Sequence, residues 1–128
     1  MKQLVANRIR TPDGTILQSY HVHDYRSHKD KNGLEYMVDG GLQYLRRTIH
    51  PNAPYTELSV YADDPFDLIR LAFCWGSRGR LGDEPLKWIA LCNLETSHIK
   101  LIIETQRQVP DYLLDIFKQE LEWRKNEV

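Results

Sequence analysis

Two short turn sequences set the tightest limits on how this chain can fold. Asp13-Gly14 follows Thr11-Pro12, and Asn32-Gly33 ends a charged stretch. Asp-Gly and Asn-Gly tolerate the positive φ angles of tight hairpin turns, and proline sets one dihedral in advance. Both dipeptides are therefore predicted to join antiparallel strands. The strands expected around them cover residues 4–10, 15–25 and 34–38, which form a three-stranded antiparallel meander.

The second half of the chain is predicted to be mainly helical. Asp64-Pro65 is typical of a helix start with Asp64 as the capping residue, and Gly76 is expected to end that helix. Thr96 or Ser97 is expected to cap a second helix. A third helix, from Pro110 to Lys125, has a broad apolar stripe that covers the sheet or, alternatively, forms a homodimer interface. Further strands are expected over residues 57–61 and 85–91, with a strand or a helical turn over 44–48.

Composition limits the size and the partners of the fold. The chain of 128 residues is 41% hydrophobic and 27% charged, with a formal net charge of −1. We expect a single α+β domain over 1–128, with strands mainly over 4–61 packed with helices mainly over 64–125. The balanced charge argues against duplex nucleic acid as a partner. No apolar stretch approaches the ~20 residues of a membrane helix, so no membrane partner is expected.

The string His21-Val22-His23-Asp24 carries two imidazoles. On a strand, His21 and His23 point to the same face, which is a known spacing for metal ligands. Only these two are at a firm spacing, and a catalytic zinc uses about three protein ligands, so we predict no metal and no other cofactor. A histidine that packs against the sheet and hydrogen-bonds Asp39 or a backbone carbonyl is favoured over a metal ligand. A general acid–base role for His21 or His23 is the alternative, and it needs a nucleophile or bound water that no motif supplies.

The string Val38–Arg47 brings a carboxylate, two glycines and two arginines into one segment. Gly40-Gly41 allows a turn with positive φ or the close approach of a ligand. The expected role of Asp39, taken by itself, is an Asx-turn in which its carboxylate accepts hydrogen bonds from the amides that follow it. Arg46 and Arg47 face opposite ways on a strand, so at most one of them shares a site with His23. One of the two is expected in the neighbourhood of His21, His23 and Asp39. A salt bridge to Asp24 or Asp39 is expected for one of the two arginines. Arginine matches phosphate geometry.

The loop Gly76–Gly82 lacks the Gly-Lys-Ser/Thr ending of a P-loop. Its amides, with Arg78 and Arg80, could hold an anion; a surface loop is the alternative, favoured on composition. Trp75, just before it, is expected in the core. The predicted ligand-binding residues are His23, Asp39, Gly40, Gly41, Arg46, Arg47, Arg78 and Arg80.

The N-terminal third resembles a family of small, functionally uncharacterised proteins of tailed bacteriophages. The resemblance runs from Asn7-Arg8-Ile9-Arg10 through His21–Tyr25 to Val38–Arg47, and weakly to Glu57-Leu58-Ser59. Some members look like zinc ribbons, but this chain has no cysteine in either turn, so a structural zinc is not expected there. The resemblance implies a phage accessory protein in the cytoplasm of a bacterial host, and supplies no activity.

Three functions follow as hypotheses. The first is a non-catalytic binding protein, an accessory or counter-defence factor, for a small phosphorylated ligand, such as a nucleotide second messenger, or for a host protein. The second is a small phosphodiesterase-like hydrolase that uses His21 and His23. The third is a regulatory partner of a host enzyme with no ligand pocket. A pocket lined by His23, one of the arginines Arg46 and Arg47, and Arg78 would favour the first.

Overall fold

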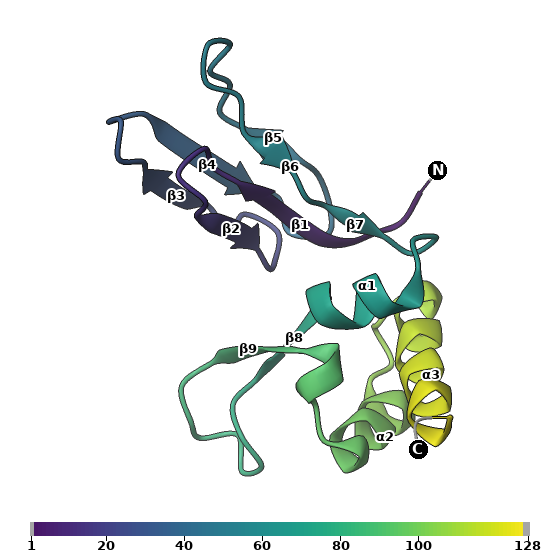
Figure 1. The fold of residues 1–128 in the computed structure, drawn as a ribbon. Coiled ribbons are helices and arrows are strands. Elements are labelled where there is room, and N and C mark those ends of the chain that lie inside the picture. Colours follow the sequence, from purple (N-terminus) through teal and green to yellow (C-terminus); the bar gives the residue numbers. More distant parts are fainter. Residues whose placement is uncertain (1, 127–128) are drawn as a thin grey trace. The chain divides into compact units, whose positions relative to one another are not determined.

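The computed structural model describes residues 2–126, and the chain divides into two compact units. The N-terminal unit is Lys2–Tyr61 and the C-terminal unit begins at Ala62. Antiparallel strands dominate the first unit and helices the second (Figure 1), so the predicted α+β class is confirmed. Each unit is described by itself, and the assignment of residues 1–128 to a single domain stays a prediction.

The N-terminal unit contains two small antiparallel sheets. One has the order β2-β1-β6, with β7 also paired to β1, and the other has the order β3-β4-β5. The strands are β1 (Leu4–Arg10), β2 (Ile16–Ser19), β3 (Arg26–Lys29), β4 (Glu35–Asp39), β5 (Arg46–Arg47), β6 (Thr56–Glu57) and β7 (Val60–Tyr61).

The two predicted hairpin turns are confirmed. Gly14, between β1 and β2, has φ 91°, and Gly33, between β3 and β4, has φ 84°. The two turns use the same bonds, since the amide of Gly14 donates to Thr11 O and the amide of Gly33 to Asp30 O, both at 2.9 Å. Glycine at this position accepts the left-handed conformation without steric cost.

The strand predicted over 4–10 is confirmed and the one predicted over 34–38 lies at 35–39, but the meander is made of different segments. The strand expected over 15–25 is wrong: it ends at Ser19, and the next strand, β3, pairs with β4. The three-stranded antiparallel meander in the structure is therefore β3-β4-β5. The strand expected over 57–61 is interrupted between β6 and β7, where the amide of Arg8 donates to Ser59 Oγ at 3.3 Å instead of to a backbone carbonyl.

The core of the N-terminal unit lies between β1 and β4. Ile9, Tyr36 and Val38 are fully buried there, and the half-buried side chains packed against them are Leu17, Leu34 and Tyr55. The Tyr36 hydroxyl is satisfied, because it donates to the carbonyl of Ala53 at 2.7 Å. Consecutive residues are buried on both β1 and β4, so these two strands are covered on both of their faces.

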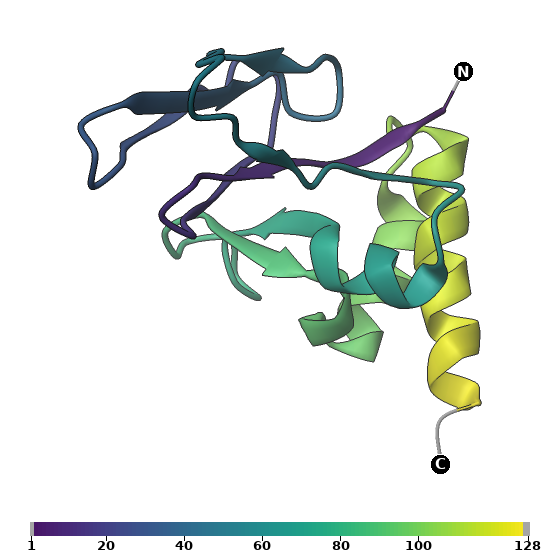
Figure 2. The ribbon, with the colours of Figure 1, turned by 45° about the horizontal axis from the view of Figure 1, so that its top comes forward.

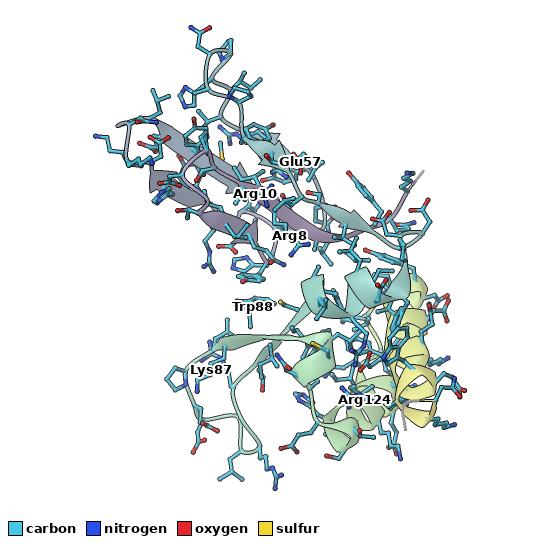
Figure 3. All side chains as sticks on the ribbon, viewed as in Figure 1. Arg8, Arg10, Glu57, Lys87, Trp88 and Arg124 are labelled. Atoms are coloured by element: carbon cyan, nitrogen blue, oxygen red, sulfur yellow. The ribbon has the colours of Figure 1, made fainter. Side chains whose placement is uncertain are left out.

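The C-terminal unit joins a hairpin to helices. Its elements are α1 (Phe66–Ala72), β8 (Cys74–Ser77), β9 (Lys87–Ala90), the 3-10 helix η1 (Leu91–Asn93), α2 (Thr96–Thr105) and α3 (Asp111–Lys125). The strands β8 and β9 pair antiparallel, and Figure 3 labels Lys87 and Trp88 on β9. None of the helices in residues 2–126 is long and apolar enough to cross a bilayer.

Three helix boundaries differ from the expectations. Pro65, rather than Asp64, is the capping residue of α1, and Glu95, rather than Thr96 or Ser97, precedes α2. The helix α1 ends at Ala72 because Phe73 turns to extended backbone, with ψ 127°, and leads into β8. Gly76 therefore lies in β8 and caps no helix.

The core of this unit is mainly aliphatic, with an aromatic group around Phe117. Phe117 on α3 makes edge-on contacts with Phe73 at 5.6 Å and with Trp75 at 5.3 Å between ring centroids, so Trp75 is a packing residue as predicted. The helices α2 and α3 lie against each other, with α3 in yellow in Figure 2. Ile99 and Ile102 on α2 are buried.

Glu120 is a charged residue inside this core. Its carboxylate is fully buried and accepts hydrogen bonds from Arg70 Nε and Nη2, both at 2.8 Å. Arg124, labelled in Figure 3, donates to the same carboxylate at 2.7 Å and also to Thr96 Oγ1 and the carbonyl of Leu91. The ion pair thus ties α1, η1, α2 and α3 together.

Candidate functional site

The His21–Asp24 string forms a turn and not a strand. The amide of Asp24 donates to His21 O at 3.0 Å, and the amide of Tyr25 to His23 O at 3.1 Å. The Asp24 carboxylate accepts the amide of Tyr20 at 2.8 Å. This local side-chain bond competes with strand pairing and accounts for the error in the predicted strand. The shared strand face expected for His21 and His23 is therefore wrong.

His23 has an unusual backbone. Its φ is 64°, and within residues 2–126 it is the one residue other than glycine with a positive φ. This left-handed conformation costs roughly 1–2 kcal/mol for residues with a Cβ atom, so surrounding structure must hold it. The His23 side chain itself is exposed.

A buried polar hub beneath the turn provides that structure. The side-chain NH2 of Asn7 lies within hydrogen-bond distance of three carbonyls, those of Asp39 at 3.0 Å, Gly41 at 2.9 Å and Tyr44 at 3.1 Å, so its two hydrogens are shared among three acceptors. Ser19 Oγ donates to Asp24 O at 2.7 Å and accepts the amide of Gly41 at 3.0 Å. Asn7 and Ser19 thus fix the 21–24 turn and the 39–44 segment to one scaffold.

Sequence reasoning missed these two hub residues. Asn7 stands in a strand of mainly apolar side chains and is fully buried, as is Ser19. A polar residue in the middle of a buried strand is a signal in its own right, because it needs partners for its donors and acceptors. That signal was available at Asn7.

The two glycines allow the chain to pass close to the turn. A Cβ atom on Gly41, whose φ is 52°, would lie 2.2 Å from the carbonyl carbon of His21. A Cβ atom on Gly40, whose φ is 109°, would lie 2.0 Å from Tyr44 O. The chain itself, rather than a ligand, makes the close approach for which glycine is required.

An exposed cluster sits on this scaffold; we call it the His23–Arg46 cluster, comprising His23, Asp39, Tyr44 and Arg46. His23 Nδ1 lies 3.1 Å from the Tyr44 hydroxyl, which donates to Asp39 Oδ2 at 3.4 Å. Arg46 Nη1 lies 3.7 Å from the same carboxylate oxygen. Because the Tyr44 hydroxyl donates its hydrogen bond to Asp39, its oxygen accepts a hydrogen bond from His23 when Nδ1 carries the ring hydrogen. The expected turn of Asp39 onto the following amides is wrong, since its carboxylate contacts Tyr44 and Arg46.

The cluster combines a buried anion with exposed donors. The Asp39 side chain is 6% exposed and the Arg46 side chain 65% exposed. Beside the cluster, Arg26 Nε donates to the buried Asp24 at 2.9 Å and its guanidinium lies over the Tyr20 ring. Burial raises the pKa of Asp24, but the bonds from Arg26 and the Tyr20 amide outweigh it, and the pKa is lowered.

Arg47 takes part in a different network. Its guanidinium binds Glu57, labelled in Figure 3, in a bidentate pair at 3.0 and 2.8 Å, and it also contacts Ser59 Oγ at 3.2 Å. Burial raises the pKa of Glu57, but bonds from Arg47 and Ser59 lower it further than burial raises it. Of the two arginines, Arg46 is therefore the one that joins the cluster, opposite Arg47 as the strand alternation predicts.

The remaining predicted site residues belong to the C-terminal unit. Arg78 and Arg80 lie in the loop between β8 and β9, where Arg80 pairs with Glu95 at 3.1 Å. A cavity in this unit is lined by Arg80 but by acidic and apolar side chains as well. Within residues 2–126, no three His, Cys, Asp or Glu side chains are grouped to hold a metal ion. Comparison with family models, curated proteins and solved structures finds no match.

Proposed function

We propose that this protein is a non-catalytic binding protein whose N-terminal unit engages a small ligand through a phosphate group. The observation that carries the proposal is the left-handed turn at His23, which holds an exposed imidazole beside Tyr44 and Arg46. Backbone strain of this kind clusters at binding sites, where it positions side chains in advance. The ligand class that fits is a phosphorylated small molecule such as a nucleotide second messenger, and the phage resemblance would make the protein an accessory or counter-defence factor.

The chemistry of the cluster supports an anion. Arg46 offers a planar fork of donors with most of its side chain in solvent, and its contact with Asp39 at 3.7 Å leaves donors unused. In the imidazolium form His23 adds the N–H of Nε2, because Nδ1 is directed at the Tyr44 hydroxyl. The buried hub of Asn7 and Ser19 keeps the backbone beneath these donors fixed, so little ordering entropy is lost when a ligand binds.

A hydrolase that uses His21 and His23 is less well supported. Nδ1 of His21 lies 3.0 Å from the carbonyl of Val22, and Nδ1 of His23 contacts Tyr44. The two rings therefore lack the common strand face that the hydrolase hypothesis requires. A ligand-free regulatory partner remains the competing proposal for this cluster.

Binding measured by isothermal titration calorimetry tests the proposal. The probes are a panel of cyclic mono- and dinucleotides, with inorganic phosphate as a competitor. We expect Arg46→Ala and His23→Ala each to weaken the bound nucleotide at least about tenfold, which corresponds to about 1.4 kcal/mol. Because both side chains are exposed, thermal melts of the two variants should stay close to the parent.

Arg10→Ala is the matched control. Arg10 is an exposed arginine on β1 of the same unit, labelled in Figure 3, and its loss should leave binding unchanged. The proposal fails if no nucleotide in the panel binds, or if binding survives both cluster substitutions. It also fails if these substitutions lower stability by the ~1–3 kcal/mol of an unpaired buried polar group, which would assign the cluster a structural role.

A further inference from the structure

A cavity of about 1120 Å³ opens in the C-terminal unit. One wall comes from Ser77 and from loop residues between Gly79 and Glu84, and the other from the segment that runs from Asn93 into the first turns of α2. Figure 1 shows where these elements lie in the unit. We call this cavity the α2 groove. All the residues that line it belong to the C-terminal unit, so its form does not depend on the His23–Arg46 cluster.

Apolar side chains line both sides of the α2 groove. Leu81 at the loop tip is 87% exposed, and Leu101 on α2 is 55% exposed. Leu94 is buried at the base, and Ile89 of β9 is half-buried. A hollow with large apolar side chains left in water at both rims is typical of a site that another molecule covers.

The loop that carries Leu81 is closed by its own hydrogen bonds. The amide of Glu84 donates to Arg78 O at 2.9 Å, and the amide of Gly82 to Gly79 O at 3.2 Å. Gly79 has φ 81°, and a Cβ atom there would overlap the Glu84 carboxylate. These contacts fix the conformation of the loop, and this conformation holds the Leu81 side chain in solvent.

The charges on the groove are unequal. Arg80 and Glu95 pair across it at 3.1 Å and offset each other. Two further carboxylates, Asp83 and Glu84, line the groove, and in the part of the chain that the structure describes neither one forms an ion pair with a basic side chain. The uncompensated charge is negative, so a cationic occupant is complementary.

We infer that the α2 groove docks an apolar, basic segment of a partner protein. Its apolar side chains would lie between Leu81 and Leu101, and a lysine or arginine would face Asp83 and Glu84. An amphipathic helix in an apolar groove is a common mode of such recognition.

Fluorescence anisotropy with a labelled amphipathic leucine–lysine peptide tests this inference. The peptide carries leucines at i, i+3, i+4 and i+7, and a matched peptide has glutamate at every lysine position. The protein should bind the lysine peptide and not the glutamate peptide. The double variants Asp83→Asn/Glu84→Gln and Leu81→Ser/Leu101→Ser should each weaken binding about tenfold or more.

Two control variants keep the outcome specific. Leu71→Ser removes a leucine that is 63% exposed on α1 outside the groove, and Glu104→Gln/Asp115→Asn removes two exposed carboxylates from α2 and α3. Both should bind like the parent, with circular dichroism confirming that all variants fold. Failure to bind the lysine peptide, equal binding of the two peptides, or equal losses in groove and control variants overturns the inference. Self-association that Leu81→Ser abolishes also overturns it, in favour of a second copy of the chain.

Discussion

The Asp13 carboxylate lies 2.9 Å from Nε2 of His28, and this contact joins the two hairpins of the N-terminal unit. Asp13 belongs to the turn between β1 and β2, whereas His28 is on β3 of the other sheet. The same carboxylate oxygen accepts the amide of Lys31 at 3.3 Å, and the other oxygen accepts from Thr11. Asp13, which the sequence predicts as a turn residue, therefore also links the two sheets of the N-terminal unit.

The pairing predicts how Asp13 titrates. The bond from His28, followed by that from Thr11, holds the pKa of Asp13 well below its ordinary value of 3.8. A lowered pKa contributes stability that is present above pH 3.8 and is lost as the pH falls through the folded-state value. In a ¹³C NMR titration, the Asp13 carboxyl midpoint should lie well below 3.8 and should rise toward it in His28→Ala. An unchanged midpoint in that variant would contradict the assigned cause.

Asn7 should be a larger determinant of stability than its size suggests. Asn7→Leu keeps a similar volume but leaves the carbonyls of Asp39, Gly41 and Tyr44 without their side-chain donor. Buried acceptors left unpaired cost about 1–3 kcal/mol, and the loss is expected at the upper end because three are affected. Urea denaturation measures it, with the exposed Gln43→Ala as control, expected within about 0.5 kcal/mol of the parent. A loss for Asn7→Leu no larger than that of the control would show that the hub is unnecessary.

Local chemistry explains which parts of the fold were predictable. Asp13-Gly14 and Asn32-Gly33 were correctly placed because a two-residue pattern is sufficient for a tight turn. The class was also correct, since the apolar periodicity changes from strand to helix spacing near Asp64. The strand over 15–25 failed because the Asp24 side chain bonds the Tyr20 amide, a contact that alternation of apolar residues does not report.

The candidate cluster was predictable from the sequence only in part, because Arg47 binds Glu57 instead and Arg78 and Arg80 belong to the C-terminal unit. The grouping of His23, Asp39 and Arg46 follows from two hairpins that return the chain to the same place. The positive φ of His23 and the role of Tyr44 were not accessible, because both depend on the buried contacts of Asn7 and Ser19. The Asp83-Glu84 pair that follows Arg80 is visible in the sequence, but composition does not show that both carboxylates line a groove.

Gly14 and Gly41 should respond differently to alanine. Both have positive φ, but a Cβ atom on Gly14 meets nothing within 4 Å, whereas one on Gly41 lies 2.2 Å from the His21 backbone. Gly14→Ala should lose about 1–2 kcal/mol from conformation alone. Gly41→Ala should lose clearly more, because the 21–24 turn must move. Chemical denaturation gives the free energy of unfolding of the two variants. Equal losses of stability would show that the 21–24 turn moves to accommodate the Cβ atom at no energetic cost.

The buried carboxylate of Glu120 provides a test in the C-terminal unit. Glu120→Gln keeps the shape but removes the buried negative charge that accepts hydrogen bonds from Arg70 and Arg124, and breaking a buried ion pair in this way costs about 3–5 kcal/mol. The exposed pair of Glu122 with Lys125, 3.1 Å apart on the same helix, is the control, and Glu122→Gln should lose less than about 1 kcal/mol.

The same carboxylate should make stability depend on acid pH. Burial raises the pKa of Glu120, but hydrogen bonds from Arg70 and Arg124 outweigh burial, so the folded-state pKa is below the ordinary 4.5. The unfolded chain therefore takes up the proton first as the pH falls. Stability should hold above about pH 4.5 and decline as the pH drops through the lower folded-state value. Urea melts from neutral pH to pH 3 should show a steeper decline in the parent than in Glu120→Gln. Parallel declines in the two proteins would assign the acid sensitivity to other carboxylates.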